Sequence, residues 1–178
     1  MFLTKQRGLS PAEAGTAMHF VMQHLDFANS NYAEQIEAMI ERELLTQQQA
    51  DSINLDQIRQ FFESPLGLRL ISSDNVHREV PFQIELPCHE LYPDLLDENC
   101  KGETLLLQGV IDCYFEEGDG IVLLDYKTDY VPEEGTELIR DRYRVQINYY
   151  ARALELLTRK QVKEKYIYLF SIGETLEF

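Results

Sequence analysis

Hydrophobic side chains recur at helical spacing throughout the first third of the chain. In "GTAMHFVMQHL" the apolar residues stand three or four positions apart, and "YAEQIEAMIERELL" repeats that spacing. Thr46 and Gln49 have the spacing of a capping box, which predicts the start of another helix. "LDQIRQFFESPLGLRLI" predicts two short helices that are interrupted near Pro65. We therefore expect residues 1–72 to be mainly helical.

The hydrophobic period changes to two after residue 72. In "VHREVPFQIEL" the apolar residues from Val76 to Leu86 fall on one side, with Arg78 as the exception, and this alternation predicts a strand. Two more strands flank "EEGDG", a long amphipathic helix follows in "TELIRDRYRVQINYYARALELLT", and "KYIYLFSI" is the last predicted strand. The polar segment "PCHELYPDLLDENCKGE" is predicted to be a loop or an insertion.

Helices followed by three strands, a helix and a strand predict an α/β domain in which helices cover a mixed central β-sheet. A length of 178 residues suits a single domain with its own hydrophobic core. We expect that domain to span residues 1–178, with a helical part at 1–72 and the sheet with its helix at 73–178. The sequence has no apolar run of membrane-spanning length and no signal-peptide core at its start, so we expect a cytoplasmic location.

The predicted hairpin around "EEGDG" brings two aspartates together. With Gly118-Asp119 as a two-residue turn, Asp112 lies directly opposite Asp125 on the neighbouring strand. Lys127 follows two residues later and shares a strand face with Asp125. Because opposed side chains have Cβ atoms roughly 5 Å apart, the two negative charges repel each other strongly.

Two opposed carboxylates coexist by sharing a proton, by pairing with cations or by holding a metal ion. Lys127 alone neutralises only one of them. Hard oxygen ligands on a rigid scaffold favour Mg²⁺ or Mn²⁺. The spacing of Asp112, Asp125 and Lys127 by itself leaves both a metal site and a structural ion-pair cluster open.

Charge and cysteine content set limits on these interpretations. The net charge of −15 argues against a free-standing nucleic-acid-binding protein, because phosphate contacts need a cationic surface. Cys88, Cys100 and Cys113 show no C-x-x-C spacing and are expected to be reduced thiols. Three cysteines are too few for an all-cysteine iron–sulfur cluster, so we expect none.

Four short motifs, in order along the chain, resemble the RecB-like branch of the PD-(D/E)XK nucleases. They are His19 in "GTAMHFVMQHL", Gly109 to Asp112 in "GVID", Asp125, Tyr126 and Lys127 in "DYKTD", and Gln146 and Tyr150 in "QINYY". The resemblance covers about residues 10–170 and implies a restriction-endonuclease-like core. The segments "FFESPLGLRLI" and "REVPF" look most like the C-terminal nuclease domain of AddA-type helicase–nucleases, which lack the four-cysteine iron–sulfur site of some relatives.

The resemblance implies a role for each motif residue. Asp112 and Asp125 would hold Mg²⁺, or Mn²⁺ in its place, with His19 and the backbone carbonyl of Tyr126 as further ligands. Lys127 would orient the attacking water and stabilise charge in the transition state. The other two motif residues would position the substrate strand or the lysine; these are Gln146 and Tyr150.

The same resemblance implies a DNA exonuclease that hydrolyses phosphodiester bonds of unwound strands, single strands preferred, during processing of double-strand breaks for recombinational repair. The chain would be part of a larger ATP-dependent helicase that works with a partner of AddB type, and by analogy it would cut the 3′-terminated strand. Motor domains that grip DNA would offset the acidity of this part. The alternatives are a non-catalytic DNA-guiding domain, an independent nuclease like phage exonucleases or Cas4, and a metal-free structural or protein-binding domain.

Several polar residues have two interpretations at the level of sequence. Glu79 is either a DNA-contacting or site-supporting acid, or an ordinary surface acid. A local basic group on the long helix either contacts phosphates or is a solvated helix face; it comprises Arg140, Arg142, Arg144 and Arg152. We interpret the remaining histidines as structural; they are His24, His77 and His89.

Overall fold

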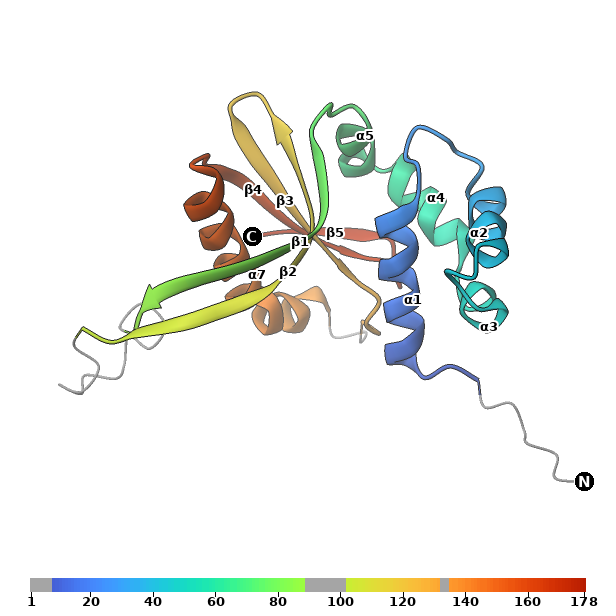
Figure 1. Cartoon of the computed structure of the whole chain (residues 1–178), viewed down its shortest axis with the longest axis horizontal. Coiled ribbons are helices and arrows are strands. Elements are labelled where there is room, and N and C mark those ends of the chain that lie inside the picture. The colour runs from blue at the N-terminus through green and yellow to red at the C-terminus, as the bar shows by residue number, and fades with distance from the viewer. Residues whose placement is uncertain (1–7, 89–101, 132–134) are drawn as a thin grey trace, which may run out of the picture.

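The computed structural model describes residues 8–88, 102–131 and 135–178 (Figure 1). The helices come first: α1 (Pro11–His24), α2 (Tyr32–Glu41), α3 (Gln47–Asp51), α4 (Leu55–Glu63) and α5 (Pro65–Ile71). They are followed by β1 (Val76–Pro87), β2 (Thr104–Glu117), β3 (Gly120–Lys127), α7 (Thr136–Thr158), β4 (Val162–Leu169) and β5 (Glu174–Glu177). The predicted mixed sheet covered by helices is confirmed. Most of the segment predicted as a loop or insertion lies outside the described residues, as do His89 and Cys100.

Side-chain caps fix where the N-terminal helices begin. Thr46 accepts a hydrogen bond from the Gln49 amide, and Gln49 bonds back to the Thr46 amide, which confirms the predicted capping box. Ser64 ends α4 and also caps α5, where its hydroxyl accepts a hydrogen bond from the Gly67 amide, so the predicted break near Pro65 is confirmed. Among the described residues, no helix combines the length and the apolar character needed to cross a membrane.

The strands form one sheet in the order β1-β2-β3-β4-β5. Neighbouring strands are antiparallel except for β3 and β4, which are parallel and are joined through α7. Gly118 adopts a positive φ of 66° in the β2–β3 turn, where glycine is favoured. The pairing of Glu117 with Gly120 follows from this turn, and the predicted hairpin register is confirmed.

Helices lie on both faces of the sheet (Figure 1), which separates two hydrophobic cores. Helices α1 to α5 lie on one face, where Met22 and Phe61 pack in the same buried cluster as Tyr126 of β3. Helix α7 covers the other face, where Ile147 packs in a cluster with Leu123 of β3. Asp125 projects from the β3 row that faces α7, so an ionisable group stands among apolar ones.

Strand β1 bends along its length (Figure 1), and its backbone is irregular at Glu79. Val76 packs on the side of α1, whereas Val80 and Phe82 pack on the side of α7. The prediction that Val76 shares a side with Val80 is therefore wrong. Glu79 has a positive φ of 50°, a conformation outside the strand region, and this interrupts the alternation of side chains along β1.

Candidate active site

Three carboxylates stand in a row across three neighbouring strands. The register of β1 with β2 is the same on both sides of Glu79 and places this residue opposite Asp112. The register of β2 with β3 places Asp112 next to Asp125, one position beyond the last regular pair. The Tyr126 amide donates a hydrogen bond of 2.8 Å to Asp112 Oδ2, which ties the β2 acid to the backbone of β3. The hairpin thus gathers like charges, as its turn predicts.

Asp125 is the most deeply buried of these acids, at 2% exposure. Its Oδ2 lies 2.5 Å from Lys127 Nζ, but neither carboxylate oxygen has a hydrogen bond of normal geometry. Burial raises the pKa of Asp125 to about 6, and the charge of Asp112 adds to this rise while Lys127 opposes it. Burial alone would lower the pKa of Lys127, but the charge and hydrogen bond of Asp125, together with the charge of Asp112, outweigh it and the pKa is raised.

Helix α1 contributes His19 to this group. Its Nδ1 lies 3.4 Å from Asp112 Oδ1. Burial lowers the pKa of His19, but the hydrogen bond and charge of Asp112 outweigh it, so the pKa is raised. Gly15, one turn earlier, allows α1 to come close to the segment after β3, because a Cβ there would lie 2.8 Å from Thr128 Oγ1. The glycine and the histidine of "GTAMHF" therefore act on the same face of the helix.

His19, Glu79 and Asp112 each offer a ligand atom within 4.8 Å of the others. These residues line a cavity of about 610 Å³, whose walls also come from the start of α1 and from the residues after β3. Burial, together with the charge of Asp112, raises the pKa of Glu79. Asp125 is not part of this three-residue cluster and is directed to Lys127 instead. The sequence alone left open whether Glu79 belongs to this site or is an ordinary surface acid.

The two motif residues on α7 contact each other. Gln146 Nε2 donates a hydrogen bond of 2.7 Å to the Tyr150 hydroxyl. The Tyr150 ring packs edge-on against Phe82 of β1, with 5.6 Å between ring centroids. Gly109 of "GVID" makes room for this packing, because a Cβ there would lie 2.9 Å from the Phe82 ring. The motif glycine thus allows α7 to lie close over the hairpin.

The basic residues of α7 have partners within the protein. Arg142 Nη1 lies 3.6 Å from Asp129 Oδ1, and Arg144 Nη2 lies 3.3 Å from Asp141 Oδ1. Arg140 donates to the Glu177 carbonyl. Both Arg142 and Arg144 remain more than half exposed, so the geometry is compatible with a solvated face and with phosphate contact.

The other described histidines pack against aromatic rings. His24 stacks on Phe20 and its Nδ1 lies 2.8 Å from the Phe20 carbonyl, whereas His77 stacks on Tyr114. Neither of them belongs to the cluster of His19, Glu79 and Asp112. Their surroundings agree with the structural role expected for them.

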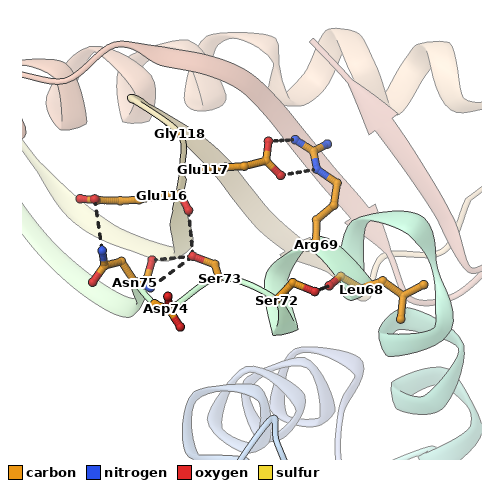
Figure 2. Close-up of a pocket in the computed structure, with 9 residues that line it drawn as sticks. All are labelled: Leu68, Arg69, Ser72, Ser73, Asp74, Asn75, Glu116, Glu117 and Gly118. Carbon is orange, nitrogen blue, oxygen red and sulfur yellow. Dashed lines mark hydrogen bonds and ion pairs between the residues drawn. The ribbon is translucent and has the colours of Figure 1, made fainter.

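A second cavity, of about 540 Å³, lies at the turn end of the β2–β3 hairpin (Figure 2). Arg69 of α5 donates two hydrogen bonds to the Glu117 carboxylate, of 3.0 and 2.9 Å, and also pairs with Glu164. The Ser73 hydroxyl donates to the Glu116 carbonyl at 2.8 Å. These polar groups bond to one another across the cavity, which indicates that they join α5 to the sheet.

Comparisons with known proteins agree with the motifs. A family model described as the PD-(D/E)XK nuclease superfamily matches residues 2–176. The chain is 62% identical over its whole length to an ATP-dependent helicase/nuclease subunit from Acetivibrio thermocellus, and 57% identical over 99% of its length to one from Ruminiclostridium cellulolyticum. A protein of the same name from Thermoanaerobacter sp. strain X514 is 52% identical over the whole chain. The chain spans 14%, 14% and 15% of the length of these relatives.

Proposed function

Because this chain belongs to the PD-(D/E)XK nuclease superfamily, we propose that it is a metal-dependent DNA nuclease domain that hydrolyses phosphodiester bonds. The observation that supports this most strongly is the buried Asp125 beside Lys127 and one strand away from Asp112. Lys127 neutralises only one of the two acids, so the pair of largely buried carboxylates remains costly unless a further cation completes the group. Buried acids in such an unfavourable environment are typical of functional sites.

The donor set suits a hard divalent cation. Carboxylate oxygens and an imidazole come together on rigid elements, which fits Mg²⁺ or Mn²⁺. The proposed ligands are His19, Asp112, Asp125 and the backbone carbonyl of Tyr126, and Glu79 faces the same cavity. A bound ion would neutralise charge on the scissile phosphate and acidify a coordinated water. Without an ion, Lys127 neutralises one of the opposed acids.

The remaining motif residues act on the substrate in this proposal. The Lys127 ammonium orients the attacking water and stabilises the charge that develops on the phosphate. The hydrogen-bonded pair of Gln146 and Tyr150 holds the lysine or the substrate strand in place. Water is the nucleophile, so no covalent intermediate forms, and the product carries a 5′-phosphate.

We further propose that the domain belongs to a longer AddA-type helicase–nuclease that processes double-strand breaks in the cytoplasm with an AddB-type partner. The names of the relatives and the small share of their length that the chain spans support this proposal. The charge of −15 also fits, because a domain that receives single strands from a motor needs little DNA affinity of its own. The proposed polarity is cleavage of the 3′-terminated strand, by analogy alone.

Two other functions are less well supported. A DNA-guiding domain without catalysis would not need Asp112, Asp125 and Lys127 together, and all three are present at one site. An independent nuclease would have to hold DNA by itself, which the acidic surface opposes.

Cleavage of end-labelled single-stranded DNA in the presence of Mn²⁺ tests the proposal. The wild-type chain is compared with Asp125→Ala and with Asp119→Ala, which removes an exposed acid from the hairpin turn. We expect Asp119→Ala to cleave as the wild type does and Asp125→Ala to lose cleavage while it remains folded. Equal cleavage by wild type and Asp125→Ala would place the active site elsewhere.

A further inference from the structure

The Lys127 ammonium contacts both a carboxylate and an aromatic ring. Its Nζ is 2.5 Å from Asp125 Oδ2 and 4.7 Å from the centroid of the Tyr143 ring. The lysine side chain is 13% exposed, so water competes little with either contact. A cation at this distance from a ring centroid is attracted to the ring face. Tyr143 therefore gives the ammonium a second contact besides Asp125.

The Tyr143 ring is itself held by the segment after β3. Its hydroxyl donates a hydrogen bond of 2.9 Å to Asp129 Oδ2. The Asp129 carbonyl accepts a hydrogen bond of 2.7 Å from the Ser171 hydroxyl, and its carboxylate lies 3.6 Å from Arg142 Nη1. These contacts join α7 to the residues that follow β3 and fix the ring at one position over Lys127.

Tyr143 shares a helix face with the motif residues of α7. It precedes Gln146 by three positions and Tyr150 by seven, a spacing that places all three on one side of a helix. All three side chains are half-buried. The face of α7 that carries Gln146 and Tyr150 thus also carries the ring that contacts Lys127.

We propose that Tyr143, anchored by Asp129, is a positioning residue that holds the Lys127 ammonium in place for the reacting phosphate. This inference rests on the proposed nuclease function, in which Lys127 acts on water and phosphate. A lysine side chain has four rotatable bonds, so one short ion pair holds the ammonium but does not fix the conformation of the aliphatic stem. The ring supplies the second contact that an oriented ammonium requires.

Steady-state cleavage of single-stranded DNA with Mn²⁺ tests the inference on the 178-residue chain. Tyr143→Leu removes the ring, and we expect kcat to fall about 10- to 100-fold, as a displacement near 1 Å does, with KM and Mn²⁺ affinity unchanged. Tyr143→Phe keeps the ring over Lys127 and is expected to restore kcat to within about 5-fold of the wild type. Tyr166→Phe is the matched control, because its hydroxyl also donates to a carboxylate, that of Glu164 on β4.

The possible outcomes separate this inference from the proposed function. No Mn²⁺-dependent cleavage by the wild type would overturn the proposed function and this inference together. Wild-type cleavage with an unchanged kcat in Tyr143→Leu would overturn the positioning role alone. A Tyr143→Leu protein that melts early and loses Mn²⁺ affinity and KM together with kcat would also overturn it, because the tyrosine would then be structural.

Discussion

Asp125 is the residue at which folding and the proposed chemistry conflict most. Its carboxylate is buried beside Asp112, and its pKa of about 6 lies above the ordinary value of 3.8. An acid whose pKa is raised in the folded protein binds its proton more tightly there than in the unfolded chain. The free energy of unfolding therefore falls as the pH rises from about 4 to about 6 and stays lower above that range.

Asp112→Asn is expected to stabilise the metal-free protein at pH 7. The amide oxygen retains the hydrogen bond from the Tyr126 amide, whereas the repulsion of Asp125 is removed. We expect the free energy of unfolding to rise by about 1 kcal/mol at pH 7 and the gain to vanish toward pH 4, where Asp125 is protonated in the wild type as well. Urea unfolding in EDTA across this pH range measures it. A variant less stable than the wild type at every pH would indicate that the acids are structural.

Among the strands, the sequence predicted correctly the register that a short turn determines. The Gly118 turn leaves one simple register for β2 and β3, so the opposition of Asp112 and Asp125 follows from residue numbers. The register of β1 was not predictable, because a long polar segment separates β1 from β2 and fixes no pairing. The place of Glu79 opposite Asp112 therefore emerged only from the structure, as did its positive φ.

The lysine-positioning role of Tyr143 was missed for a related reason. Its helical spacing predicts a residue on the apolar face of α7, and Tyr143 does pack against the buried cluster on that side. Contact with Lys127 depends on how the crossover from β3 to β4 places α7 over the sheet, which periodicity does not encode. A residue that reaches a site from another helix or strand can be identified only from the tertiary structure.

The junction of α4 and α5 depends on a glycine. A Cβ at Gly67 would lie 2.1 Å from the Phe61 carbonyl oxygen, a backbone atom that moves only with its helix. We expect Gly67→Ala to lower the free energy of unfolding by about 1–3 kcal/mol, as overpacking does. Gly8→Ala is the matched control, because nothing lies within 4 Å of a Cβ there. Thermal and urea unfolding of both variants measure the effect, and equal stability would show that α5 shifts without cost.

At the scale of the whole molecule, charge governs how the domain meets DNA. A surface at −15 repels a polyanion, so binding depends on the few phosphate contacts that exposed Arg142 and Arg144 offer, and added salt weakens these contacts. We expect weak, non-processive digestion that prefers single strands over blunt duplex, falls with added salt and rises when the proposed helicase domains are joined to the chain. Digestion of both substrates across a salt series measures this. Rapid, salt-insensitive degradation of blunt duplex would contradict the proposed place of this domain in a helicase.

Paired measurements on Lys127→Ala separate metal binding from catalysis, because Lys127 is proposed to act on the substrate and not to hold the ion. Mn²⁺ binding is measured by calorimetry and cleavage of single-stranded DNA is measured on the same samples. We expect both proteins to bind Mn²⁺ and only the wild type to cleave DNA. Cleavage by Lys127→Ala at the wild-type rate, or no Mn²⁺ binding by the wild type, would contradict it.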